Sequence, residues 1–147
     1  MAWAAPFGED WKALWDGCPR GDWLLALAAR AEVESQKIAA AAVAVAEEVR
    51  EYTEHPSVLE GLTALRAGHP SELPSPADPI EDAALRALHA AALAQTDPAA
   101  AAGVAAALAH LAAVDAGDCA MMSAVAYAHH RAATVVRTII GVDDLAI

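Results

Sequence analysis

Six histidines are the residues of this sequence best suited to metal binding or acid–base chemistry. Four of them fall on the last three segments with helical character, and His89, His110 and His129 represent one for each segment. If these segments form an antiparallel bundle, His89 and His129 lie at similar heights, and His110 lies about 7 Å away along the axis. One zinc ion cannot bind all three side chains across that offset, because its bonds to imidazole nitrogen are about 2.0–2.1 Å long. No Glu-x-x-His pair recurs on two helices either, so we expect no metal site and no cofactor.

Nucleophilic and phosphate-binding patterns are also absent from the sequence. No Gly-x-Ser-x-Gly, Cys/His or paired-carboxylate arrangement is present, and the segment 17–21 lacks both the Walker lysine and a preceding strand. Cys18 and Cys119 lie far apart in no metal or redox spacing, which indicates reduced thiols. We therefore expect no catalytic residue and no enzyme activity.

Two polar surfaces remain as candidates for partner binding. An acidic run near residue 50 is either a solvated helix face or a docking surface for a basic partner. A polar stripe on the last helix carries Tyr, His and Arg, which are common at interfaces, although a plain exposed face is the alternative. The candidate partner-binding residues are Glu47, Glu48, Glu51, Glu54, Tyr127, His130 and Arg137.

Helices must position these residues, because apolar side chains recur at steps of three and four through most of the chain. Asp residues, two of them followed by Pro, are the expected N-caps, and Gly or Pro marks the stops. The expected helices are 8–16, 23–31 with Asp22 as its N-cap, a long one reaching about residue 52, 56–67, and three that follow Asp78, Asp97 and Asp118. On the last helix the expected buried face is Met121, Val125, Ala128, Ala132, Val135 and Ile139.

Tryptophan is concentrated in the opening of the chain, at positions 3, 11, 15 and 23. Such a cluster is typical of a small satellite core that holds the N-terminal helices onto the rest of the fold. Arg20 and Asp22, which lie inside it, would then form a structural pair.

The composition predicts an all-α fold of one domain. About three residues in ten are Ala, the strongest helix former, and the alternating Val/Ile/Tyr pattern of strands is missing. A chain of 147 residues suits a single core. We expect a bundle of six to seven helices with Ala-rich seams and no sheet, with a proline-rich connection at 69–79 between its two halves.

The net charge of −11 and a pI of about 4.7 disfavour nucleic acid and anionic membranes as partners, and favour basic proteins. Solubility alone is the other explanation of this acidity. The N-terminus has no basic n-region, and the longest apolar runs, 38–46 and 99–109, are shorter than the 18 or so residues of a membrane span. A cytoplasmic protein is therefore expected.

The segment 15–28, Trp-Asp-Gly-Cys-Pro-Arg-Gly-Asp-Trp-Leu-Leu-Ala-Leu-Ala, resembles the opening of a family of bacterial immunity proteins of polymorphic toxin systems. The likeness continues through an Ala-rich helical middle to a polar last helix at 129–137 and the tail 142–145. The resemblance implies an inhibitor that binds a toxin in the cytoplasm and protects its own cell. It carries over no binding residue.

Two functions follow from the sequence. The first is a non-enzymatic binding protein of the immunity type, whose partner is a basic toxin domain. The second is a helical scaffold or adaptor that assembles with another protein or with a second copy of itself, for which Ala-rich seams are suited.

Overall fold

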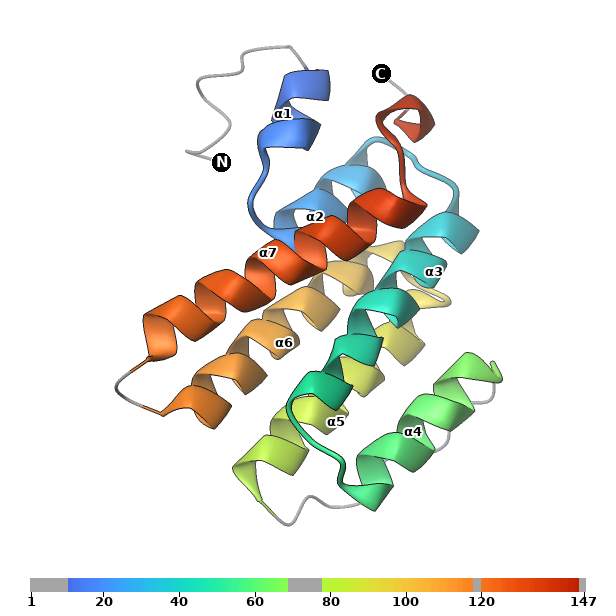
Figure 1. Cartoon of the computed structure of the whole chain (residues 1–147). Coiled ribbons are helices and arrows are strands. Elements are labelled where there is room, and N and C mark those ends of the chain that lie inside the picture. Colours follow the sequence, from blue (N-terminus) through green and yellow to red (C-terminus); the bar gives the residue numbers. More distant parts are fainter. Residues whose placement is uncertain (1–10, 69–77, 118–119, 146–147) are drawn as a thin grey trace.

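A computed structural model describes residues 11–68, 78–117 and 120–145. These residues form seven α-helices and three short 3₁₀ segments, and no strand is found among them (Figure 1). The all-helical prediction is therefore confirmed. The α-helices are α1 Trp11–Gly17, α2 Gly21–Arg30, α3 Ser35–Ala46, α4 Pro56–Arg66, α5 Pro79–Ala94, α6 Ala101–Ala116 and α7 Met121–Ile139, and the 3₁₀ segments are η2 Glu47–Glu51, η3 Pro98–Ala100 and η4 Val142–Asp144.

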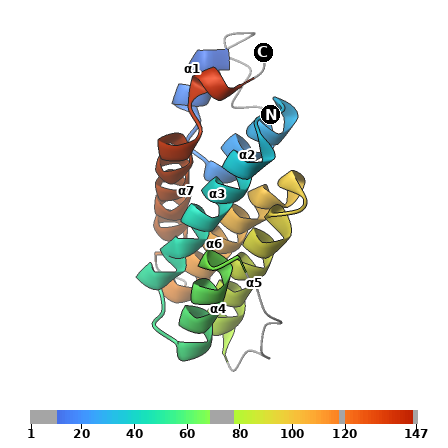
Figure 2. The ribbon, with the colours of Figure 1, turned by 90° about the vertical axis from the view of Figure 1, so that its right-hand side faces the viewer.

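Helix α6 lies in the middle of the bundle. It packs against α5 and α7, its neighbours in sequence, and against α2 and α3. Helix α4 lies at the edge, beside α5, and α1 lies at one end near η4 (Figures 1 and 2). Residues of α3 and α7, which are far apart in the sequence, are thereby brought into contact.

Side-chain caps explain where α5 and η3 begin. The carboxylate of Asp78 accepts a hydrogen bond from the backbone N–H of Glu81, and that of Asp97 accepts one from Ala99, as predicted. Pro occupies the first turn of α4, α5 and η3. Gly117 ends α6 with a φ of 69°, which an L side chain rarely adopts. The predicted cap Asp118 lies outside the described residues.

The start of α2 differs from the prediction. Asp22 is not its N-cap, because the helix begins at Gly21 and the N-cap residue, Arg20, makes no side-chain capping bond. The Asp22 carboxylate instead accepts hydrogen bonds from the guanidinium of Arg20. The predicted Arg20–Asp22 pair is thus confirmed, while the capping role is wrong.

The core is one cluster of buried side chains in which alanine fills much of the space between helices. Buried apolar side chains recur at helical steps along α3, α4, α5 and α6, while Leu59, Ile80 and, beyond α3, Tyr52 are partly exposed. Trp15 is buried in this same cluster rather than in a separate one, and Trp23 packs against it. The other two tryptophan side chains lie outside the described residues.

The buried face of α7 is rotated from the predicted one. Met121, expected in the core, is 42% exposed, and Val125, Val135 and Ile139 are only partly buried. The reason is that α2 approaches α7 beside Ala132 and Ala133, which turns that side of the helix inward. The fully buried positions are Ala128, His129, Ala132, Ala133 and Val136.

By length and composition alone, Pro98–Ala116 could cross a membrane, with a mean hydropathy of 1.6. This segment contains the apolar run 99–109 and extends past His110 to the end of α6, with Asp115 as its single charged residue. It packs against α2, α3, α5 and α7, and 39% of its apolar window is buried. Length and composition of this kind are weak evidence for a membrane span, because the core helix of a soluble protein can meet the same criterion.

Candidate functional site

Three of the four predicted acidic residues lie around a shallow depression. Glu47, Glu48 and Glu51 of η2 line it together with Arg50 of the same segment, Arg66 of α4 and Val135 of α7, and its volume is about 450 Å³. These acids lie in η2, a 3₁₀ segment that follows the end of α3 at Ala46, whereas one helix was predicted to reach about residue 52.

Two ion pairs tie the depression to other helices. Glu47 accepts a hydrogen bond from Arg66 Nε at 2.8 Å, and Glu48 accepts one from Arg131 Nη2 at 2.9 Å. The contact with Glu48 raises the pKa of the Arg131 guanidinium. Arg131 Nε is buried without a hydrogen-bond partner among the described residues. The Glu48–Arg131 pair joins the acidic segment to α7, so the two surfaces predicted from the sequence meet.

Two tyrosines extend this junction. Burial raises the pKa of the half-buried Tyr52 phenol, and the neighbouring Tyr127, Glu48 and Glu51 raise it further by smaller amounts. Tyr127 itself is 55% exposed, as expected for the polar stripe. The combined surface therefore offers an exposed aromatic ring beside several carboxylates.

The remaining predicted residues lie differently. Glu54 and His130 are exposed. Arg137 is only partly exposed, and its guanidinium donates hydrogen bonds to the backbone carbonyls of Trp15, at 2.6 Å from Nη2, and of Cys18. Arg137 thus anchors the α1–α2 connection to α7, a contact that its place in the polar stripe does not indicate. A role for it in partner binding stays a prediction.

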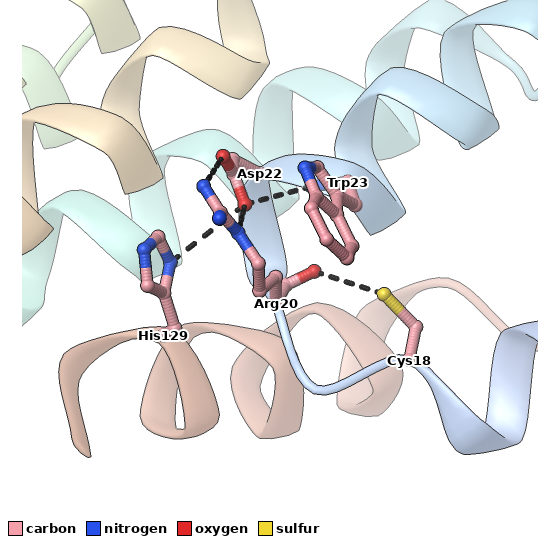
Figure 3. Close-up of polar contacts among 5 residues, drawn as sticks. All are labelled: Cys18, Arg20, Asp22, Trp23 and His129. Atoms are coloured by element: carbon pink, nitrogen blue, oxygen red, sulfur yellow. Dashed lines mark hydrogen bonds and ion pairs between the residues drawn. The ribbon is translucent and has the colours of Figure 1, made fainter. Parts of the chain in front are cut away.

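A second polar cluster lies where α2 begins against α7 (Figure 3). Arg20 donates to both oxygens of Asp22, from Nε at 3.0 Å and from Nη2 at 2.7 Å, and its guanidinium stacks 4.4 Å from the ring centroid of Trp23. Cys18 is buried, with its thiol donating to the Arg20 carbonyl. Burial raises the pKa of this thiol, which makes it a poor nucleophile.

His129 of α7 completes the cluster. It is 8% exposed, and its Nδ1 lies 3.7 Å from Asp22 Oδ1, too far for a hydrogen bond (Figure 3). Nδ1 has no other hydrogen-bond partner among the described residues. Burial and then the positive charge of Arg20 lower the pKa of the imidazole, while Asp22 acts in the opposite direction. The neutral ring is therefore favoured in the folded protein.

An apolar groove of about 410 Å³ adjoins this cluster. Arg20 and His129 lie at its polar side, and Met122, which is 88% exposed, projects beside it. The lining residues are Pro19, Arg20, Met121, Met122, Val125, Ala126 and His129.

Comparison with known proteins adds nothing to this geometry. No protein family, no curated protein and no solved structure matches the chain. The resemblance of its opening segment to bacterial immunity proteins therefore stays a prediction.

Metal-binding chemistry is not assembled in the described part of the chain. No group of three or more His, Cys, Asp or Glu side chains in that part could hold a metal ion. His89 and His110 are exposed, whereas His129 is buried, so these histidines differ in their surroundings.

One buried polar group was not foreseen from the sequence. Glu81, 3% exposed, accepts a hydrogen bond from the Ser57 hydroxyl at 2.6 Å, and His55 Nδ1 lies 3.6 Å from the same carboxylate oxygen. These residues join the N-termini of α4 and α5, where helix dipoles favour a carboxylate. The signal available in the sequence was the position of Glu81 three residues after its cap, Asp78.

Proposed function

We propose that this protein is a non-enzymatic binding protein of the immunity type, which binds and neutralises a basic toxin domain in the cytoplasm. The partner lies on the surface formed by Glu47, Glu48, Glu51, Tyr127 and Arg131. The observation that carries the proposal is the Glu48–Arg131 pair, which makes the acidic segment and the polar side of α7 one continuous surface around a depression.

The chemistry of this surface suits a basic protein. Three carboxylates and the guanidinium groups of Arg50 and Arg66 line the depression, so the attraction of a positively charged partner comes mainly from the net charge of −11. Tyr127 adds an amphipathic ring of the kind that is enriched at interfaces. Glu48 is held in place by its ion pair, so less side-chain entropy is lost when a cationic side chain of the partner binds beside it.

The test begins with a search for a toxin-like domain encoded beside the gene for this protein, and a domain found there is produced in an inactive form. We expect the two purified proteins to form a complex, and the association rate to fall steeply as salt is added. Co-expression of this protein with the active toxin should restore growth of the host cell.

A matched pair of charge reversals localises the interface. Glu51→Lys changes the charge at the depression, whereas Glu34→Lys makes the same change at the opposite end of α3. Glu51→Lys should weaken binding by about tenfold or more, which corresponds to about 1.4 kcal/mol, and Glu34→Lys should have only a small effect through net charge. Equal losses for both variants, or no complex with the neighbouring toxin, would contradict the proposal.

A further inference from the structure

The polar cluster at the start of α2 places an arginine and a histidine around one carboxylate. Arg20 donates to Asp22 Oδ1 from Nε and to Asp22 Oδ2 from Nη2. On the other side of the same carboxylate, His129 Nδ1 lies 3.7 Å from Oδ1 and has no hydrogen-bond partner (Figure 3). A movement of about 1 Å would bring this nitrogen to hydrogen-bond distance. His129 is therefore placed to bind Asp22 but does not bind it in this arrangement.

The reason is that Oδ1 already has its full set of donors. A carboxylate oxygen offers about two lone pairs, and those of Oδ1 are taken by Arg20 Nε and by the backbone N–H of Trp23, each at 3.0 Å. The Trp23 N–H belongs to the first turn of α2 and cannot move away by itself. His129 can therefore reach Oδ1 only when Arg20 Nε leaves it.

Protonation of His129 favours that exchange. The protonated imidazole carries an N–H on both ring nitrogens, so Nδ1 becomes a charged donor that faces a carboxylate. It also places a second positive charge beside the Arg20 guanidinium. Burial and the charge of Arg20 both lower the pKa of the imidazole, while Asp22 raises it. Departure of Arg20 removes the repulsion and keeps the attraction.

Of the two cations, Arg20 is the one that can move. Its side chain is partly exposed and borders the apolar groove of about 410 Å³, which leaves room beside it. The side chain of His129 is buried on α7, and α7 packs against α2, α3 and α6. Protonation therefore displaces the arginine rather than the histidine.

Other charged groups do not compete for His129. Among the described residues, Arg20 and Asp22 are the charged groups that shift its pKa. The other titratable residues of the 18–20 connection and of α2, α3, α6 and α7 do not act on it, and these are Cys18, Arg30, Lys37, His110, Asp115, Tyr127, His130, Arg131 and Arg137.

We propose that this cluster is an acid-sensitive switch, in which protonated His129 takes Asp22 Oδ1 through Nδ1 and the Arg20 guanidinium loses its two-point contact. The Arg20–Asp22 pair joins residues two apart in the chain, whereas the His129–Asp22 pair joins α7 to α2. Acid thus replaces a local ion pair by one between helices. The released guanidinium also leaves the face of the Trp23 ring, because the carboxylate no longer holds it there.

The experiment is an NMR titration of the full chain from about pH 8 to about pH 5, the range in which histidine titrates. We expect the Arg20 Nε–H signal to move from the position of a hydrogen-bonded guanidinium towards that of a guanidinium in water. Its midpoint should equal that of the His129 ring signals. Circular dichroism over the same range should show that the helices stay intact. Arg20→Gln, which also assigns the signal, should raise the pKa of His129, and Asp22→Asn should lower it.

A matched pair of histidine variants provides the control. His129→Gln removes the proton-binding group and should leave the Arg20 signal unchanged across the range. His110→Gln, at an exposed position of α6, should behave as the parent does. An Arg20 signal that ignores the protonation of His129, or that still moves in His129→Gln, would overturn the proposal. So would a His129 ring that takes up its proton only as the helices unfold, and the parent titration decides this without any variant.

Discussion

Replacing Gly21 by Ala should test how closely α2 and α7 are packed. A Cβ atom built on Gly21 would lie 2.5 Å from Ala132 Cβ, 2.8 Å from the Ala132 carbonyl carbon and 3.0 Å from the Ala133 nitrogen. Two of these atoms belong to the backbone of α7, so a change of side-chain rotamer cannot relieve the contact. The helices would have to separate by about 1 Å to reach ordinary contact distances of 3.5–4.0 Å.

The magnitude follows from two opposing effects. Over-packing of a core typically costs about 1–3 kcal/mol, and contacts with backbone put this case at the upper end. Replacement of Gly by Ala in a helix contributes up to about 1 kcal/mol in the other direction, and less at a first helical position such as this one. We therefore expect Gly21→Ala to lower the free energy of unfolding by about 1–2 kcal/mol, or the Tm by about 2–8 °C.

Urea unfolding followed by circular dichroism would measure this change. Gly103→Ala in α6 is the control, because its Cβ would meet Ala90 Cβ at 3.6 Å, an ordinary contact. That variant should gain about 0.5–1 kcal/mol. The double variant Gly21→Ala/Ala132→Gly should recover only part of the loss, since the backbone contacts remain. If Gly21→Ala is as stable as Gly103→Ala, the close approach of α2 and α7 is refuted.

Three further predictions concern single polar groups. Arg137→Ala should lower the free energy of unfolding by about 1.5–3 kcal/mol, which is the usual contribution of a charge-assisted hydrogen bond. Arg137→Lys should recover only part of this loss, because lysine lacks the planar fork of the guanidinium group. Urea unfolding would measure both variants. Folding lowers the pKa of His129, so the unfolded chain binds a proton on this residue at a higher pH than the folded protein does. The free energy of unfolding should therefore keep its full value above about pH 6.5 and fall as the pH drops below that value. His129→Phe should flatten that pH dependence of the urea midpoint, and substitution of the exposed His110 should not. Asp78→Ala should cost about 0.5–2 kcal/mol through loss of the cap of α5, seen as a lower Tm.

Features that depend on nearby residues could be predicted from the sequence. The caps Asp78 and Asp97 and the stop at Gly117 act within a few residues, so their effect is visible in the sequence itself. The apolar seams of α3 and α6 were predicted for the same reason, because their periodicity is clear.

Features that depend on contacts between distant helices could not be predicted from the sequence. The rotation of α7 depends on the contact of Gly21 with Ala132, more than a hundred residues away, and the Ala-rich sequence allows several buried faces of equal hydrophobicity. Arg137 was assigned to an exposed stripe because helical periodicity does not show that backbone carbonyls of the α1–α2 connection lie beside it. Helical periodicity likewise does not show that His129 lies beside Asp22.

These long-range contacts explain why the opening segment and α7 have to be considered together. Gly21 and the carbonyls that bind Arg137 fix the position of α7, and α7 carries one side of the proposed toxin-binding surface. Displacement of α7 by Gly21→Ala should therefore impair toxin binding, as Glu51→Lys should. A Gly21→Ala variant that folds but keeps this interaction intact would mean that α7 tolerates movement. In that case the segment 18–23 would serve stability alone.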